Sequence, residues 1–166
     1  ELVPDSAGLV LVPAFTGLGT PYWDMYARGL LIGLTRGVNK AHICRAALEA
    51  IAFQVKDIIH CMEEDSASAL SCMKVDGGAS VSEILMQFQS DMLDTKVLRP
   101  KNTETTALGA AYLAGLAVGF WQDEEELFST WQKDKSFEPK MQREKREELY
   151  ARWKQAVERS RSWLDV

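Results

Sequence analysis

The sequence has few of the residues that build metal sites and disulfide frameworks. Its 166 residues include three cysteines, Cys44, Cys61 and Cys72, and two histidines, His42 and His60. Three is an odd number and no CxxC pair occurs, so we expect reduced, buried thiols and a cytoplasmic location. The histidines are too few and too far apart to form a zinc site with these cysteines. The sequence therefore predicts no metal site in this chain.

Long apolar runs and clusters of positive charge are missing as well. No apolar stretch reaches the roughly 18 residues of a membrane-spanning helix, because charged residues such as Arg28, Arg36 and Lys40 interrupt the candidates. The formal net charge is −5, and the basic residues form no clustered face outside the C-terminal tail. Phosphate-backbone binding depends on such a face. We therefore expect no membrane span, no secretion signal and no nucleic acid as the main partner.

What the sequence does contain suits one globular domain. Hydrophobic residues make up 46% of the chain and charged residues 26%. A domain of this size buries enough apolar surface to form a core without disulfides. The chain opens with Glu1, Leu2, Val3 and Pro4 instead of an initiator methionine, which favours an excised piece of a longer protein.

Strand and helix patterns alternate through most of the chain and predict an α/β fold. Short apolar runs bounded by turns indicate strands, and apolar residues at helical spacing indicate helices. Asn39 is the predicted N-cap of the first helix, and Ser80 with Glu83 gives a predicted capping box. The predicted strands are residues 9–12, 30–34, 72–75 and 95–98, and the helices run from Asn39 to about Glu63, from Ser80 through Met92, and from Thr103 or Thr105 to Gly119.

Two of these helices have distinctive faces. Apolar residues recur along the helix after Asn39, and we expect this face to pack on the sheet; they are Ile43, Ala47, Ala50, Ile51, Ile58 and Met62. The helix before Gly119 is nearly bare on one side; its small residues are Gly109, Ala110, Ala111, Ala114 and Gly115. Such a helix can lie close to another element or to a ligand, and close packing is the more common reason.

Charged residues concentrate from Asp123 onward, so the chain divides near Trp121. Residues 1–121 form the predicted α/β core, and residues 122–166 form a predicted helical extension packed on the same domain. Asp123 with Glu126 gives another cap signature. The charged face of the extension is interpreted as solvated, and its apolar stripe consists of Leu149, Trp153, Ala156, Val157 and Leu164.

The segment that most strongly suggests chemistry is VDGGAS, residues 75–80, between a predicted strand and a predicted helix. A glycine pair lets backbone amides approach a ligand, and a helix N-terminus adds positive partial charge. Nucleotides are bound in this way, although a tight turn explains the same two glycines. Asp76 is open to roles as a general base, as a Mg²⁺ ligand or, in the interpretation we favour, as a carboxylate that bonds nearby amides.

Other enzyme signatures are absent from the sequence. It has no GxxxxGK[ST] phosphate-binding loop and no GxSxG nucleophile elbow, and the glycines at positions 17 and 19 lack the third glycine of a dinucleotide fingerprint. The sequence offers no convincing nucleophile. Trp23 and Asp24 are interpreted as parts of a packed loop with a satisfied carboxylate.

Several segments resemble one known family. VPAFTGLGTPYWD at 12–24 is similar to a stretch of the glycerol kinase branch of the FGGY family of carbohydrate kinases. GLLIGL at 29–34, followed after seven residues by HICRAALE at 42–49, fits the second signature of that family in spacing and residue class. LMQFQSD at 85–91 and TALGAAYLAG at 106–115 resemble the glycerol kinase branch in particular. The similarity covers nearly the whole chain and is loose over residues 132–148.

The resemblance implies an actin-like, ribonuclease-H-like fold of two domains with a cleft between them. It implies transfer of the γ-phosphoryl group of MgATP to glycerol, giving sn-glycerol 3-phosphate and ADP. By this resemblance, the chain corresponds to most of the C-terminal domain. In the family, the catalytic aspartate and the polyol-binding residues lie upstream of it, so no catalytic residue and no metal ligand is assigned here, and we expect the fragment alone to be inactive.

What the resemblance carries over is nucleotide binding. Gly78 matches a glycine that contacts the nucleotide in glycerol kinases, and Gly77 and Ala79 are its neighbours in the same turn. Ser82 stands where the family often has asparagine. A hydroxyl can donate and accept, but it is shorter than an amide and cannot do both with separate atoms.

The implied partners are the N-terminal domain of the same kinase, the substrates ATP and glycerol, and further copies of the full-length enzyme in a homo-oligomer. One alternative is the same domain of an FGGY kinase for another sugar, such as xylulose or gluconate. A second is a non-catalytic actin-like binding module whose charged tail contacts a partner.

Overall fold

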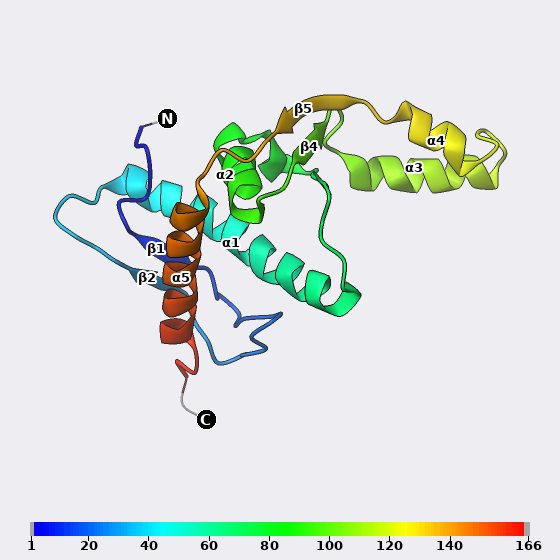
Figure 1. Ribbon diagram of the computed structural model, residues 1–166. Coiled ribbons are helices and arrows are strands. Elements are labelled where there is room, and N and C mark those ends of the chain that lie inside the picture. Colours follow the sequence, from blue (N-terminus) through cyan, green and yellow to red (C-terminus); the bar gives the residue numbers. More distant parts are fainter. Residues whose placement is uncertain (1, 165–166) are drawn as a thin grey trace.

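The computed structural model describes residues 2–164, except for the side chains of residues 128–130. It confirms the predicted α/β class (Figure 1). In chain order the elements are β1 (Val10–Val12), β2 (Leu30–Ile32), α1 (Lys40–Ser66), β3 (Met73–Lys74), the 3₁₀ turn η1 (Gly78–Val81), α2 (Glu83–Leu93), β4 (Val97–Pro100), α3 (Thr105–Ala117), α4 (Glu124–Thr130), β5 (Lys133–Phe137) and α5 (Arg143–Ser160).

The strands form two small sheets. β1 and β2 pair antiparallel, with Val10 opposite Ile32. In the second sheet β3 pairs parallel with β4, and β4 pairs antiparallel with β5, so the sheet is mixed. The helical prediction for the extension is wrong at β5. Its sequence, KDKSF, is too charged to indicate a strand, and its pairing with β4 decides its structure.

The core lies where α1, α2 and α5 meet. The Phe53 ring of α1 stacks on Trp153 of α5 with 5.3 Å between centroids and meets the edge of Phe88 of α2 at 5.5 Å. Trp153 is fully buried. The predicted stripe of α5 is therefore confirmed at Trp153, Ala156 and Val157, whereas Leu164 is 40% exposed and lies beyond the helix.

Helix α1 begins as predicted but buries a different face. Asn39 caps it by accepting a hydrogen bond from the Ala41 amide at 2.9 Å. Ala50 of the expected face is buried, whereas the larger apolar members are exposed: Ile43 37%, Ile51 40%, Ile58 44% and Met62 59%. The prediction for the exposed members is wrong, because the residues that α1 buries are Ala46, Glu49, Ala50, Ala52, Phe53 and Asp57. Glu49 and Asp57 make this face look polar in the sequence, but both carboxylates have hydrogen-bonding partners, which allows their burial.

Asp57 joins α1 to two other parts of the chain. It is 3% exposed and accepts hydrogen bonds from the Tyr22 hydroxyl at 3.0 Å, the Tyr150 hydroxyl at 2.6 Å and the Trp153 indole at 2.7 Å. Burial, together with the neighbouring Asp57 carboxylate, raises the pKa of both tyrosines well above their usual range. The two hydroxyls therefore remain protonated donors.

Asp24 confirms the prediction of a satisfied carboxylate. Its Oδ1 accepts from the amides of Tyr26 at 2.8 Å and Ala27 at 3.0 Å, and its Oδ2 accepts from the Ser162 amide at 2.8 Å. The Ser162 amide is the main reason that the pKa of Asp24 is lowered. Asp24 thus fixes its own loop and holds the chain after α5 against it.

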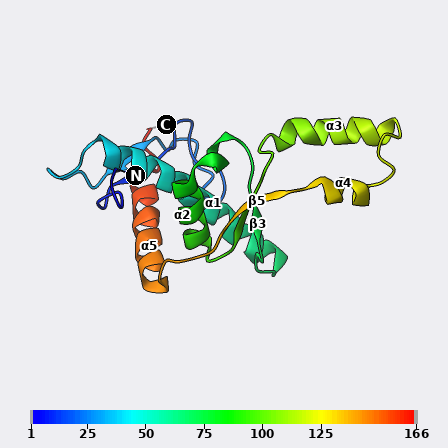
Figure 2. The ribbon, with the colours of Figure 1, turned by 90° about the horizontal axis from the view of Figure 1, so that it is seen from above.

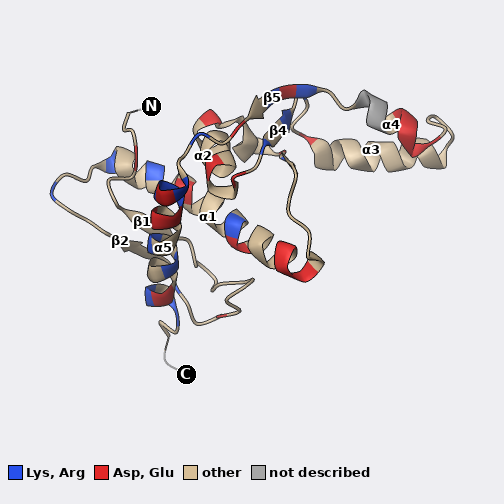
Figure 3. Cartoon of the chain, in the orientation of Figure 1, with Lys and Arg blue, Asp and Glu red and all other residues tan. Residues whose placement is uncertain are grey.

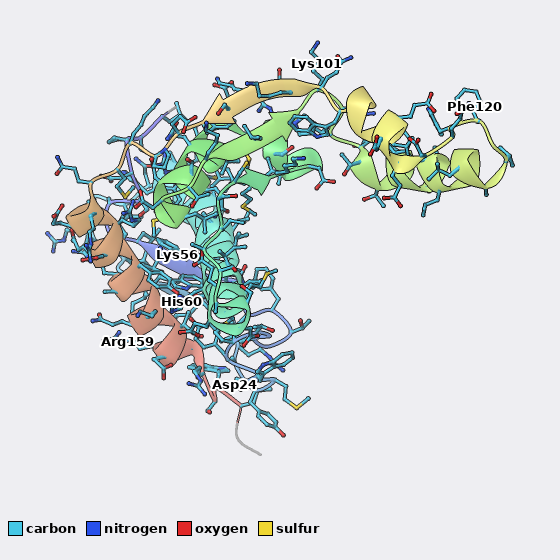
Figure 4. All side chains as sticks on the ribbon, turned by 45° about the vertical axis from the view of Figure 1, so that its right-hand side comes forward. Asp24, Lys56, His60, Lys101, Phe120 and Arg159 are labelled. Atoms are coloured by element: carbon cyan, nitrogen blue, oxygen red, sulfur yellow. The ribbon has the colours of Figure 1, made fainter. Side chains whose placement is uncertain are left out.

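Helices α3 and α4 project away from the other helices in both ribbon views (Figures 1 and 2). Phe120 lies at their far tip, remote from Asp24 (Figure 4). A Cβ at Gly115 would lie 2.2 Å from the Trp121 ring, so close packing is confirmed there. A Cβ at Gly109 would meet nothing within 4 Å, so the predicted close approach is not seen at that end of α3.

The cysteines are free but not buried as predicted. Cys44 is exposed, and Cys61 and Cys72 are half-buried. Cys44 and Cys61 belong to α1, and Cys72 directly precedes β3. Among residues 2–164, no helix is both long and apolar enough to cross a membrane.

The Asp57 contacts generate a stability prediction. Asp57→Ala should lower the free energy of unfolding by about 3 kcal/mol or more, because a hydrogen bond to a charged group contributes about 1.5–3 kcal/mol and buried donors would lose their acceptor. Tyr22→Phe removes one of the three donors to this carboxylate and should cost about 1.5 kcal/mol, the lower end of that range. Urea denaturation measures both. A loss for Asp57→Ala no larger than that for Tyr22→Phe would contradict this account.

Candidate functional site

The predicted site forms a turn that follows β3. The sheet ladder continues past the strand, since the Val75 amide donates to the Leu98 carbonyl at 3.0 Å. The Gly77 amide then donates to the Thr103 carbonyl at 2.8 Å. Gly77 has φ +76° and ψ 173°, a conformation that is essentially restricted to glycine. Gly77 therefore turns the chain away from the sheet.

A 3₁₀ turn separates the glycine pair from helix α2. The turn η1 begins at Gly78, and α2 begins at Glu83. The capping role predicted for Ser80 is wrong: Ser80 is buried, and its hydroxyl donates to the Gly77 carbonyl at 2.7 Å, closing the turn. Ser82 is the N-cap of α2 instead, since its Oγ accepts from the Leu85 amide at 3.3 Å.

The turn leaves two backbone donors available. Within residues 2–164, the amides of Gly78 and Ala79 donate no hydrogen bond, as expected for the first residues of a 3₁₀ turn. Both residues are exposed, and a Cβ at Gly78 would meet no atom within 4 Å. Free amides next to open space form a surface that can accept an anionic or hydrogen-bonding ligand.

Asp76 lies exposed at the start of the turn. No hydrogen bond or ion pair within the described part of the chain involves it, so the favoured interpretation of a carboxylate bonded to nearby amides is not observed. No group of three His, Cys, Asp or Glu side chains among residues 2–164 could hold a metal ion.

Arg99 of β4 hydrogen-bonds to the backbone of the turn. This residue was not identified from the sequence. Its guanidinium donates to the carbonyls of Ser80 at 3.1 Å and Val81 at 3.3 Å. It also pairs with Asp134 of β5 at 2.7 Å. No local pattern marks it, because Arg99 is separated from Ser80 by 19 residues and from Asp134 by 35.

An apolar groove of about 670 Å³ lies between α3 and α4. Leu108, Tyr112 and Leu116 line it from α3, and Leu127 lines it from α4. Lys74 of β3 and Trp131 also line it, with Nζ of Lys74 4.8 Å from the centre of the Trp131 ring. The signal that predicts this groove is the composition of α3, which has apolar or small residues on every side.

Residues 1–118 match the C-terminal domain of the FGGY family of carbohydrate kinases. The chain belongs to this family. It is 62% identical to a glycerol kinase of Brachyspira hyodysenteriae over 161 residues. This aligned region covers 97% of this chain and 33% of the relative. A glycerol kinase of Oleidesulfovibrio alaskensis is 60% identical, over 98% of this chain and 33% of its own length. This FGGY domain thus spans about a third of the length of these relatives.

Solved structures agree on the fold. A glycerol kinase of Plasmodium falciparum, determined with ADP, is 37% identical with a TM-score of 0.84, over 99% of this chain and 32% of that one. A xylulose kinase of Lactobacillus acidophilus is 26% identical with a TM-score of 0.69, over 93% of this chain and 30% of that one. The resemblance and the actin-like, ribonuclease-H-like fold predicted from the sequence are confirmed.

The two glycines should respond differently to alanine. Gly77→Ala forces a side chain into a glycine-only conformation and should cost about 1–3 kcal/mol of unfolding free energy. Gly78→Ala adds a methyl group to open space at a negative φ and should change it by less than about 0.5 kcal/mol. Urea denaturation of the two variants compares them, and equal losses would contradict the conformational difference between these positions.

Proposed function

We propose that this chain is the nucleotide-binding C-terminal domain of a glycerol kinase, which transfers the γ-phosphoryl group of ATP to glycerol and yields sn-glycerol 3-phosphate. The observation that carries the proposal is the exposed turn with free amides at Gly78 and Ala79, in a chain that is about 60% identical to glycerol kinases over nearly all its length. The chain's own contribution is to bind and orient ATP.

The geometry of the turn supports a role for four residues. Gly77 sets its direction, and Gly78 and Ala79 present their amides to the nucleotide. Gly78 has no side chain between its backbone and the ligand. Ser82 already accepts a hydrogen bond from Leu85, so its hydroxyl proton is what it can offer to ATP. We propose these four residues as the nucleotide contacts.

Phosphoryl transfer depends mostly on positioning and on neutralising charge around the transferred group. We propose that this chain supplies no catalytic residue; within its described part, no group of three His, Cys, Asp or Glu side chains could hold a metal ion. We propose that Mg²⁺ arrives with ATP and that the base acting on glycerol belongs to another part of the enzyme. Closure of two domains would then exclude water from the centre.

The partner that we propose is the remainder of the same polypeptide, including the N-terminal domain. A helix that is apolar on all sides is normally buried. Helix α3 has no charged residue (Figure 3), yet Leu113 beside its groove is 71% exposed. The exposed isoleucines of α1 are a second uncovered surface. The relatives are about three times as long as this chain, so they contain enough polypeptide to cover both.

Further parts of the proposal concern organisation and location. We propose that residues 1–121 are the nucleotide-binding core and residues 122–166 an extension of the same domain, supported by the β4–β5 pairing and the burial of Trp153. We also propose a cytoplasmic location, supported by the three unpaired cysteines, and a homo-oligomer of the full-length enzyme, as the family resemblance implies.

A kinase for another sugar is the alternative that an observation favours, because xylulose and gluconate kinases share this fold at 26% identity. Assays of the full-length enzyme with ATP and glycerol, xylulose or gluconate decide between them. We expect glycerol to be phosphorylated in preference, and no turnover from the 166-residue chain alone. Turnover by the isolated chain, or preference for a sugar, would contradict the proposal.

Nucleotide contact at Gly78 is tested in the full-length enzyme. Gly78→Val places a branched side chain where ATP would lie and should raise the KM for ATP about tenfold, equivalent to about 1.4 kcal/mol, with the KM for glycerol unchanged. Gly19→Val is a matched control, because a Cβ at Gly19 also meets nothing within 4 Å. Gly19 lies in another loop, so this variant should leave the KM for ATP unchanged. An unchanged KM for ATP in Gly78→Val would refute the contact.

A further inference from the structure

We propose that Arg99 is a positioning residue that holds the 3₁₀ turn in the conformation that binds the nucleotide. This inference rests on the proposed function and adds a residue outside the Asp-Gly-Gly segment to it. Arg99 contacts the turn at its end, through the carbonyls of Ser80 and Val81, and not at the free amides of Gly78 and Ala79.

The guanidinium sits in a defined, mostly buried position. The Arg99 side chain is 12% exposed and lies 5.6 Å from the centre of the Phe137 ring. Its Nη1 donates to the two turn carbonyls, while Nε and Nη2 lie 2.8 Å and 2.7 Å from Oδ2 of Asp134. One rigid, planar group therefore joins η1 to β5.

The turn has few other ties. Within it, Ser80 bonds back to Gly77, and the Gly77 amide bonds to Thr103. Among the residues that the structure describes, Arg99 is the side chain from outside residues 77–82 that hydrogen-bonds to the backbone of η1. The Gly77 carbonyl lies in the same peptide plane as the Gly78 amide, and it accepts hydrogen bonds from the Ser80 amide at 3.1 Å and the Ser80 hydroxyl at 2.7 Å. By holding the Ser80 carbonyl, Arg99 therefore constrains the Gly78 amide through Ser80.

The neighbouring charges favour this arrangement. Glu83, in the first turn of α2, lies 3.9 Å from Nη2 of Arg99 and bonds to Lys135 at 2.6 Å. The bond to Lys135 is the main reason that the pKa of Glu83 is lowered. Both carboxylates, Asp134 and Glu83, thus lie near Nη2 of Arg99, while Nη1 donates to the turn carbonyls.

Substitution in the full-length enzyme tests the role. Arg99→Met removes all of these hydrogen bonds, and Arg99→Lys keeps the charge without the planar fork. Both should raise the KM for ATP about tenfold, by the scale of charge-assisted hydrogen bonds, while kcat and the KM for glycerol change by less than about threefold. If Arg99→Met does not fold, Arg99→Lys decides.

Arg146→Met is the matched control for loss of a buried arginine. Arg146 is 8% exposed, donates to the Asp91 carbonyl at 3.3 Å and pairs with Asp94, so it supports the opposite end of α2. This variant should lose thermal stability with an unchanged KM for ATP. A KM increase in Arg146→Met equal to that in Arg99→Met would show a general loss of stability and overturn the positioning role.

A double variant separates this inference from the proposed function. If Arg99 acts through the turn, adding Arg99→Met to Gly78→Val should raise the KM for ATP by much less than the product of the two single effects. Two outcomes would overturn only the role of Arg99: single effects on the KM for ATP that multiply in the double variant, or a normal KM for ATP in both Arg99 variants while Gly78→Val raises it. A normal KM for ATP in Gly78→Val would instead overturn the proposed function.

Discussion

The arrangement of the helices depends on the hydrogen bonds that the buried carboxylate of Asp57 accepts. It lies on α1 and accepts from Tyr22 in the loop before β2 and from Tyr150 and Trp153 of α5. A buried charge is tolerated only when hydrogen bonds replace its lost water, and three donors provide that replacement. Asp57 therefore fixes where α5 and the Tyr22 loop lie relative to α1.

The candidate site is connected to this core through helix α2. Trp153, oriented by Asp57, stacks on Phe53, and Phe53 packs against Phe88 of α2. The N-terminus of α2 follows η1 directly, with Ser82 as the shared residue. The turn is thus joined at its C-terminal end to a helix of the packed core, whereas Gly78 and Ala79, which carry the free amides, are exposed to solvent. A rigid support beneath an open backbone suits a site that must orient a ligand.

Helices α1 and α3 leave apolar side chains exposed outside this small core. Trp121 shields part of α3 at Gly115, but Leu113 and Phe120 remain largely exposed. The charged face of α5, by contrast, pairs its charges on its own surface, as between Arg143 and Glu147. Exposed ion pairs of this kind contribute little to stability. Apolar surface on α1 and α3 thus distinguishes the faces that we propose to be covered by the rest of the enzyme from the charged face of α5, which contacts water.

The sequence by itself determined the family, the α/β class, the Asn39 cap and the turn at Gly77, because these depend on local motifs and backbone preferences. Tertiary structure alone decided which face of α1 is buried, because Asp57 finds donors from residues 35, 93 and 96 positions away. It also decided that the charged segment at Lys133–Phe137 is a strand, since β4 offers it an edge. The same holds for Arg99: its contact with the turn is a product of sheet pairing, and no local pattern encodes it.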